Sequence, residues 1–253
     1  MPTSSQFPAE LFNRYGTGID LDQKVRYTEG MTFLNRWILE LCRPYLGHDL
    51  LEIGPGTGAL LEQLIEHYPF RAYTAIDLHG PTVTWFRQRY AERQNITILE
   101  GDFMDPTHFP NRARDFDTII SISCLEHIPD DVAAVQGMKQ LLRPQGKIVL
   151  YLPAMQSLFN IGDHLVGHYR RYDKSMLREL AEKSGLTLHA MRYCNLPGIL
   201  SWMRNARAQK TQPFFEAVVP SPWLVPWISA YLRLENHMPL PIGLNMFCVL
   251  TPK

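Results

Sequence analysis

The sequence of 253 residues is poor in cysteine and has no excess of charge of either sign. Lys plus Arg total 25 and Asp plus Glu total 25, so the formal net charge is zero. This balance gives no electrostatic reason to expect nucleic acid or an anionic membrane as a partner. The four cysteines lie far apart and form no C-x-x-C pair: Cys42, Cys124, Cys194 and Cys248. That spacing excludes a disulfide framework and a cysteine zinc site, and it is typical of reduced cytoplasmic proteins.

Long hydrophobic runs are also missing. No apolar stretch is long enough to span a bilayer. Residues 1–5 lack the basic and apolar regions of a signal peptide. We therefore expect a cytoplasmic protein without stable membrane insertion. The chain length suits one α/β domain with an insertion.

A strand, a glycine-rich turn and a helix follow one another near the start of the chain. Residues 49–53 are mostly apolar, residues 54–58 read Gly-Pro-Gly-Thr-Gly, and residues 59–66 are apolar at helical spacing. Glycine lets a ligand lie against the backbone of such a turn. The spacing Gly-x-Gly-x-Gly differs from the pyrophosphate-binding Gly-x-Gly-x-x-Gly and favours an adenosine-type ligand without a diphosphate. For the same reason we expect no nicotinamide-dependent oxidoreductase.

Strands and helices then alternate along the chain. We expect further strands at residues 72–76, 95–100, 116–123, 147–152, 186–194 and 245–250, and helices at 31–45, 81–93, 129–142 and 173–184. The helix 129–142 is predicted to be capped by Asp130. Alternation of this kind predicts a parallel sheet with helices on both faces. Ligands of such sheets lie beyond the carboxyl ends of the strands.

Four motifs in this order resemble those of the class I S-adenosylmethionine-dependent methyltransferases. They are residues 52–58, Asp77, residues 101–103 and residues 117–127. The resemblance implies an α/β fold: a doubly wound, seven-stranded, mostly parallel, Rossmann-like sheet whose last strand runs antiparallel beside the fifth. A single domain is expected, with an N-terminal helical cap (1–46), a cofactor-binding core (47–194), a C-terminal lid insertion (195–243) and the last strand (244–253).

The resemblance also implies how S-adenosylmethionine is held and S-adenosylhomocysteine is released. Gly54, Gly56 and Gly58 are expected to face the methionine part and the ribose. Glu52 is expected to hold the turn or to meet the amino group through water. Asp77, at the end of the second strand, is expected to accept hydrogen bonds from the ribose hydroxyls.

Further cofactor contacts are expected at the ends of later strands. Leu78 is expected to lie against the adenine. Asp102 is expected to accept from the adenine amino group, and Phe103 to donate its backbone N–H to the ring. Ile122 and Ser123 are expected to meet the methionine part.

Two histidines are candidate catalytic residues, His127 and His168. An imidazole titrates near neutral pH and can remove a proton from the methyl acceptor. The alternative for His127 is that it only shapes the turn after the fourth strand. A metal site built from Asp163, His164 and His168 is not expected, because Gly162 and Gly167 predict a loop and not a helix there.

The polar segment 163–173 is a candidate substrate-binding site. Its run from Gly167 to Tyr172 resembles a subset of these methyltransferases linked to sugar, lipid or secondary-metabolite modification. Paired arginines suit a carboxylate or phosphate; the equal alternative is that they pair with local acids and fix the loop. The expected substrate-binding residues are Tyr15, Asp163, Arg170, Arg171 and Tyr172.

Two peripheral segments leave alternatives open. The helix 31–45 is expected either to cover the cofactor pocket or to pack on the sheet edge. The insertion 195–243 is rich in proline and tryptophan, and its segment 223–228 suits a substrate lid, a dimer contact or a membrane contact. A homodimer therefore stays open.

The sequence as a whole predicts methyl transfer to oxygen or nitrogen, less readily to carbon, of a small molecule that carries a carboxylate or phosphate. An alternative keeps the cofactor but not the transfer: a protein of this fold that catalyses a rearrangement or cyclisation, or acts as a binding partner. A methyltransferase of RNA or protein is disfavoured by the neutral charge and by the missing Asn-Pro-Pro-Tyr-type signature after the fourth strand.

Overall fold

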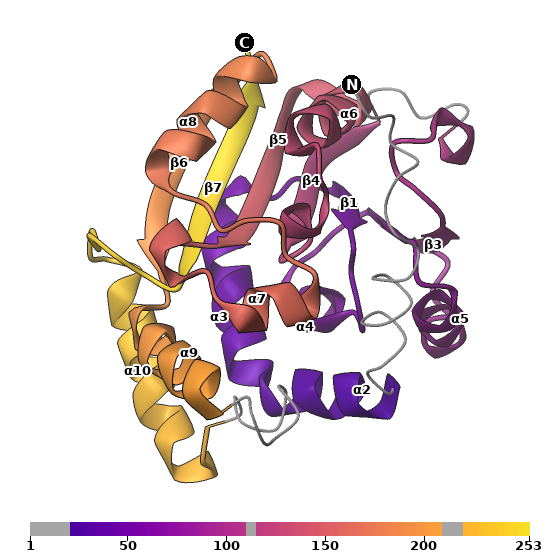
Figure 1. Cartoon of the computed structure of the whole chain (residues 1–253). Helices are drawn as coiled ribbons and strands as arrows, with labels where there is room; N and C mark the ends of the chain where they lie inside the picture. The colour runs from indigo at the N-terminus through magenta and orange to yellow at the C-terminus, as the bar shows by residue number, and fades with distance from the viewer. Residues whose placement is uncertain (1–20, 110–114, 209–219) are drawn as a thin grey trace.

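The computed structural model describes residues 21–109, 115–208 and 220–253. Within these residues, seven strands form one sheet in the order β3-β2-β1-β4-β5-β7-β6 (Figure 1). The strands are β1 (Asp49–Ile53), β2 (Ala72–Asp77), β3 (Ile96–Glu100), β4 (Phe116–Ile122), β5 (Leu142–Pro153), β6 (Leu186–Cys194) and β7 (Asn245–Pro252). β1 to β5 are parallel, and β7 runs antiparallel to both β5 and β6. This confirms the predicted fold class, including the antiparallel last strand.

Helices cover both faces of the sheet. They are α2 (Leu21–Gly30), α3 (Thr32–Cys42), α4 (Ala59–His67), α5 (Gly80–Arg89), α6 (Asp131–Leu141), α7 (Ile161–Val166), α8 (Lys174–Lys183), α9 (Leu196–Ala208) and α10 (Val225–Glu235). The apolar sides of α6 and α8 share one buried cluster with the sheet, and those of α3, α4 and α5 line two others. Nowhere in the described ranges does a helix have both the length and the apolar character to cross a bilayer.

Local sequence explains where several elements begin. The Asp130 side chain accepts a hydrogen bond from Ala133 N at 2.9 Å and caps α6, as predicted. His79 caps α5 in the same way through Thr82 N. Each cap satisfies one of the N–H groups that a helix leaves unpaired at its start.

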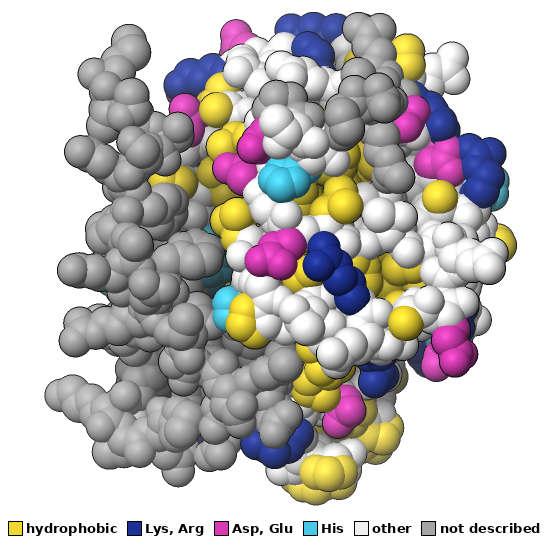
Figure 2. Space-filling model, turned by 90° about the vertical axis from the view of Figure 1, so that its right-hand side faces the viewer, with side chains coloured by type: hydrophobic (Ala, Val, Ile, Leu, Met, Phe, Trp, Pro, Cys, Tyr) yellow, Lys and Arg dark blue, Asp and Glu magenta, His cyan; other side chains and the backbone are white. Residues whose placement is uncertain are grey.

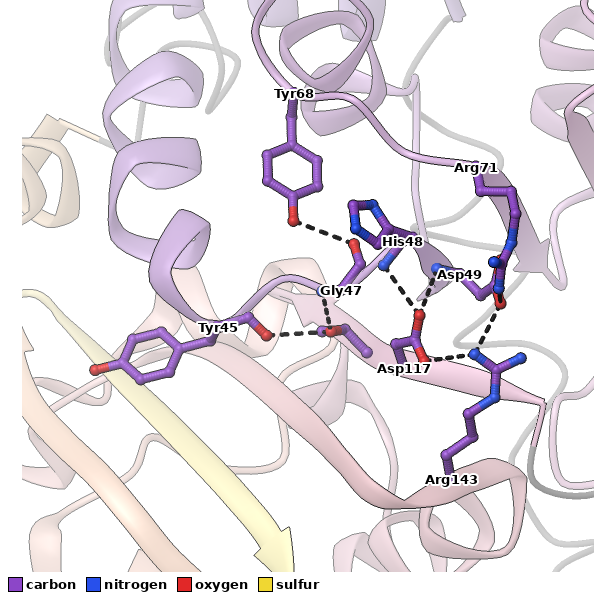
Figure 3. A network of polar contacts seen from close by, with 9 residues as sticks. Tyr45, Gly47, His48, Asp49, Tyr68, Arg71, Asp117 and Arg143 are labelled. Carbon is purple, nitrogen blue, oxygen red and sulfur yellow. Dashed lines mark hydrogen bonds and ion pairs between the residues drawn. The ribbon is translucent and has the colours of Figure 1, made fainter.

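A polar network fixes the end of the sheet where β1 begins (Figure 3). Asp117 Oδ2 accepts from the backbone N–H groups of His48 and Asp49, both at 3.0 Å. Arg143 Nη1 lies 2.5 Å from Asp117 Oδ1 and 2.8 Å from Asp49 Oδ2, and Arg71 also pairs with Asp49. The network joins β1 to β4 at the amino end of the strands, opposite the end where ligands are expected.

α3, which lies within the predicted helix 31–45, lines a cavity and packs on the face of the inner strands β5 and β7, not on the sheet edge. Trp37 and Leu41 pack against the sheet, while Asn35 and Ile38 line a cavity described below. The helix therefore covers a pocket and packs on the sheet at once.

The segment 161–166 corrects one expectation, because it is a short helix and not a loop. Asn160 caps α7, and the Asp163 side chain reaches back to the Asn160 backbone at 2.9 Å, which makes a capping box. Gly167 ends the helix in the left-handed conformation, with φ of 82°. The glycine therefore terminates the helix and does not prevent it.

The insertion contributes α9 and α10 at one edge of the molecule (Figure 1), where Leu196 N at the start of α9 donates to Glu235 Oε2 at the end of α10 at 3.1 Å. α10 is anchored to α3, since Trp37 Nε1 donates to Leu232 O at 2.8 Å. Two tryptophans of the insertion, Trp223 and Trp227, are more than two-thirds exposed, at 71% and 74%. The role of this surface as lid, dimer contact or membrane contact stays a prediction.

Candidate active site

The turn after β1 has a left-handed backbone at its three glycines. φ is 68° at Gly54, 55° at Gly56 and 77° at Gly58, which residues with a Cβ rarely adopt. A Cβ on Gly58 would lie 2.4 Å from Phe86 Cε2, whereas a Cβ on Gly56 would meet no described atom within 4 Å. Gly58 is therefore required for packing against α5, and Gly56 leaves open space above the turn.

These two glycines make a matched pair of test positions. We expect Gly58→Ala to lower the free energy of unfolding by more than the roughly 1–2 kcal/mol of left-handed strain alone, because Phe86 must also move. Gly56→Ala should cost only the strain, yet it should weaken ligand binding, because its methyl group enters the open space. Urea denaturation and ligand titration of both variants measure the difference. Equal losses of stability would contradict the assignment of Gly58 to packing.

A cavity of about 380 Å³ lies beyond the carboxyl ends of β1 and β4. Its volume falls in the range of about 300–1,000 Å³ that small-molecule sites occupy. The wall combines the glycine turn, two strand ends and the helices α2, α3 and α4: Thr28, Asn35, Ile38, Glu52, Gly54, Pro55, Gly56, Thr57, Ala59, Leu60, Ile122 and Ser123. Half of the ten predicted cofactor residues are brought together here, namely Glu52, Gly54, Gly56, Ile122 and Ser123.

Sequence reasoning missed the residues that α2 and α3 add to this wall. Thr28 Oγ1 lies 2.5 Å from Thr57 Oγ1, a hydrogen bond that ties α2 to the glycine turn. Asn35 Nδ2 donates to Thr28 O at 3.3 Å. The sequence signalled a covering helix, but nothing in it distinguishes Thr28 and Asn35 from polar residues that face solvent.

Asp77 ends β2 beside the turn. Its Oδ1 accepts from His79 N at 2.9 Å, and its Oδ2 lies 3.4 Å from Gly56 N. The carboxylate is half-buried, and Leu78, next in the chain, is 56% exposed. Asp77 therefore offers remaining lone pairs to a hydroxylated ligand, with an apolar side chain beside it.

Asp102 and Phe103 lie outside the cavity wall, in the segment that follows β3. Asp102 is exposed and accepts from Met104 N at 2.9 Å. Phe103 is buried in the core shared with α6. The buried Phe103 side chain anchors this segment and thereby fixes the position of the Phe103 backbone N–H. The adenine contacts expected of these two residues stay predictions.

Glu52 is a buried acid in the cavity wall. It is 2% exposed and accepts a hydrogen bond from the hydroxyl of Tyr73. Burial raises the pKa of Glu52 to about 7; the Tyr73 hydrogen bond acts to lower it, and the nearby Asp77 adds to the increase. A carboxyl group in this state gains most from a cationic ligand group, which would stabilise its ionised form.

This raised pKa predicts a pH-dependent stability. Folding raises the pKa of Glu52 from 4.5 to about 7, so the folded state binds the proton more tightly. The contribution to stability is complete below pH 4.5 and is lost as the pH rises through about 7. Glu52→Gln should therefore be more stable than the parent by roughly 3 kcal/mol at about pH 8 and not at acid pH. Urea denaturation of the ligand-free proteins tests this. A difference that does not depend on pH would contradict burial as the cause.

The turn after β4 places a buried carboxyl group beside two histidines. Glu126 is 0% exposed, and within the described ranges neither of its carboxyl oxygens has a hydrogen-bond partner. Its Oε1 lies 3.7 Å from His168 Nε2, and the rings of His127 and His168 meet edge to face with centroids 4.7 Å apart. The two predicted catalytic histidines thus lie together, next to a residue that sequence reasoning did not single out. Neither lines the cavity, whereas Ser123, four residues before His127, does.

Burial shifts the pKa values of Glu126 and His127. It raises the pKa of Glu126 to about 7 and lowers that of His127 to about 4; the neighbouring His168 acts to lower both pKa values. His127 is therefore neutral near pH 7, and its lowered pKa makes it a weaker base than an exposed imidazole.

Asp163 connects α7 to His168 and Arg171. Its Oδ1 lies 2.8 Å from His168 Nδ1 and 2.9 Å from Arg171 Nε. Burial acts to raise the pKa of Asp163, but the hydrogen bonds from His168 and Arg171 hold it below the usual value. The Arg171 guanidinium lies over the ring of Trp202, 4.2 Å from its centroid.

The other predicted substrate residues also have partners inside the protein. Arg170 donates to the carbonyl oxygens of Ile128 at 2.8 Å and Pro129 at 2.5 Å. Tyr172 is buried, and its hydroxyl donates to Asp131 Oδ2 at 3.1 Å. These contacts, with those of Arg171, favour the alternative that the segment is fixed by its own pairs. Substrate binding here stays a prediction, and Tyr15 lies outside the described residues.

Comparison with known proteins finds a likeness for the middle of the chain. A family model described as a methyltransferase domain matches residues 51–150. The nocamycin O-methyltransferase of Saccharothrix syringae is 35% identical over 121 residues, which are 47% of this chain and 42% of that protein. The malonyl-[acyl-carrier protein] O-methyltransferase of Paenibacillus sp. is 31% identical over 102 residues, 40% of this chain and 37% of that protein. The matches thus span less than half the length of these two relatives.

Solved structures share the fold at low sequence identity. The phosphoethanolamine N-methyltransferase 2 of Haemonchus contortus, in complex with S-adenosyl-L-methionine, superposes with a TM-score of 0.63 and 16% identity, over 100% of this chain and 62% of that one. The [4+2]-cyclase SpnF gives 0.59 and 16%, over 87% of this chain and 81% of that one. These structures share the fold of this chain, and residues 51–150, which hold the glycine turn and the ends of β1 and β4, match a methyltransferase domain.

Proposed function

We propose that this protein transfers the methyl group of S-adenosylmethionine to an oxygen or nitrogen atom, less readily to carbon, of a small molecule. One observation carries the proposal: the glycine turn, Glu52 and Ser123 face a single cavity beyond the ends of β1 and β4. The cavity combines backbone that a ligand can approach with a buried acid. Both suit an adenosyl group joined to an amino acid.

The residues of the cavity have separate tasks. Glu52 accepts hydrogen bonds from the ammonium group of the methionine part, directly or through water, and is ionised by it. Asp77 accepts from the ribose hydroxyls. The cofactor supplies a methyl group on a sulfonium, which leaves by direct displacement once the acceptor atom is aligned with it.

The acceptor must often lose a proton as the methyl group arrives. His127 and His168 lie on the turn that follows Ser123 and on the segment after α7, and they are the proposed proton acceptors. Asp163, bonded to His168 Nδ1, holds that ring in place. Arg170, which is partly exposed, is proposed with Tyr15 to bind an acidic group of the substrate, whereas the buried Tyr172 supports the segment through Asp131.

Calorimetric titration with S-adenosylmethionine, S-adenosylhomocysteine and NAD is the first test. Micromolar binding of the two sulfur compounds without binding of NAD is expected. Transfer of a labelled methyl group to small hydroxy acids, amines and phosphate esters, with RNA and protein as competing acceptors, then tests the acceptor class. Absence of binding by both sulfur compounds, or transfer to RNA or protein alone, would overturn the proposal.

A second function keeps the cofactor without the transfer, namely a rearrangement or cyclisation. The likeness of the fold to a cyclase supports it as an alternative. Tight binding of S-adenosylmethionine, with no transfer to any acceptor class tested, would favour this function.

The surface supports a small acceptor over a polyanion. Basic and acidic side chains alternate with one another on the described part of the face shown in Figure 2, and the net charge is zero. Such a surface lacks the one-signed field that nucleic acid requires. The four cysteines are unpaired thiols, which supports work in the reducing cytoplasm.

A further inference from the structure

We propose that Glu126, His127 and His168 form a site for one divalent transition-metal ion of the zinc type. Each residue offers a ligand atom, and these atoms lie within 4.8 Å of one another, the one such grouping in the described residues. The chemistry is that of zinc sites with an open position, in which imidazole nitrogens and a carboxylate oxygen leave a fourth place for water or substrate.

The two ring nitrogens of His168 have different neighbours. Nδ1 of His168 is bound to Asp163, so Nε2 points toward Glu126, 3.7 Å from Oε1. Nδ1 of His127 lies near Gly167, because a Cβ built on that glycine would be 3.7 Å from it. Metal-binding histidines commonly donate their second nitrogen to a carboxylate or a backbone carbonyl in this way.

The distances are close to those of a tetrahedral site. Metal–ligand distances of about 2.0–2.2 Å place neighbouring ligand atoms about 3.3–3.6 Å apart. The Glu126–His168 separation of 3.7 Å already meets this, and the widest separation is 4.8 Å. Side-chain rotations that move the ligand atoms by about 1 Å would bring all three to these separations.

The burial of Glu126 is the independent observation that points to a ligand. A fully buried carboxyl group without a hydrogen bond is unfavourable, and buried charges are normally paired or bound to a metal. The nearby cation Arg171 is committed to Asp163 and the ring of Trp202. His168 Nε2, at 3.7 Å, is too distant to donate a hydrogen bond to Glu126, and a metal ion between Glu126, His127 and His168 would supply a direct partner.

The composition of the site selects among metals. Two imidazoles and one carboxylate suit Zn²⁺ or Co²⁺, whereas Mg²⁺ prefers oxygen ligands. A catalytic role for the ion rests on the proposed methyl transfer: the ion would bind the acceptor oxygen and lower its pKa. His127 and His168 would then act as ligands and not as free bases.

His164 provides a matched control. It is exposed, its ring packs edge to face on Phe159 with centroids 4.8 Å apart, and it lies outside the three-residue set. It stands four residues before His168, on α7, so His164→Ala changes the same region without touching the proposed ligands.

The test is titration of the full chain, freed of metal by a chelator, with Zn²⁺, Co²⁺ and Mg²⁺. Calorimetry gives stoichiometry and affinity, and Co²⁺ gives a visible absorption spectrum that reports tetrahedral ligands. One Zn²⁺ or Co²⁺ per chain, with much weaker Mg²⁺ binding, is expected. His164→Ala should bind as the parent does, and Glu126→Gln and His168→Gln should each lose affinity by more than about 100-fold, more than an outer-shell change costs.

Circular dichroism and thermal melting of each variant show whether it is folded. Glu126→Gln keeps the shape of the side chain, so a folded variant that still binds Co²⁺ like the parent would overturn the site. Failure of the parent to bind Zn²⁺ or Co²⁺ at one per chain would overturn it as well. Titration of the metal-free protein with S-adenosylmethionine measures cofactor binding separately. Failure of the metal site is therefore distinguishable from failure of the proposed function.

Discussion

Replacing Asp77 by alanine is expected to weaken the binding of S-adenosylmethionine by about 100-fold or more. A hydrogen bond to a charged group contributes about 1.5–3 kcal/mol, and a ribose would give this carboxylate two of them. Asp77 also accepts from His79 N at 2.9 Å, so part of the effect will be a looser start of α5. Calorimetric titration gives the affinity, and urea denaturation gives the stability separately.

Two further variants sharpen this test. Asp77→Asn keeps the shape and removes the charge, and an intermediate loss of affinity is expected. Asp105→Ala is the control, because Asp105 is also an acid in a turn and accepts from Thr107 N at 2.9 Å, but it has no expected ligand. If Asp77→Ala binds S-adenosylmethionine as tightly as the parent does, Asp77 has no role in binding the ribose.

Replacing Arg171 by methionine is expected to lower the free energy of unfolding by about 3–5 kcal/mol, because it leaves the buried Asp163 carboxylate without its cation. Arg171 is 1% exposed, and Asp163 is 0% exposed. The neighbouring Arg170 is the control: it lies nearer the surface, where it pairs with Asp131 at 3.2 Å and donates to two carbonyl oxygens, so Arg170→Ala should cost less, about 1–2 kcal/mol. Urea denaturation measures both variants.

The double variant Arg171→Met with Asp163→Asn separates charge from packing. It should be less destabilised than the sum of the single variants, because no unpaired charge remains in the interior. If Arg171→Met folds with the stability of the parent and loses turnover but not cofactor affinity, Arg171 binds substrate and the structural assignment is wrong.

His168→Ala should damage turnover more than it damages cofactor affinity.

The sheet and the glycine turn were predictable because their signals are local. An apolar strand of five residues, three glycines and an apolar helix follow directly in the chain, and patterns of this kind need no knowledge of distant residues. α7 was not predicted because Gly162 and Gly167, only five residues apart, both disfavour a helix. The capping box of Asn160 and Asp163 starts the helix, and Gly167, with φ of 82°, ends it, so the same residues that argued for a loop define a short helix.

Only the site residues at the ends of strands were predictable from the sequence. The cavity gathers Glu52, Gly54 and Gly56 because parallel strands bring their carboxyl ends together. The burial of Glu126 was not predictable, since its neighbour His168 is distant in the chain and the contact depends on how α7 meets the turn after β4. The same holds for Thr28, whose place in the cavity wall depends on the packing of α2.

The hydrogen bond between Thr28 and Thr57 affects how fast a ligand can enter and leave the cavity. Part of the cavity wall belongs to α2, which precedes the sheet in the chain and is tied to the glycine turn by this hydrogen bond. Such an element can open locally with a free energy far below that of global unfolding. The dissociation rate of the spent cofactor would then follow the opening of α2, and turnover could be limited by release while the methyl-transfer step stays fast.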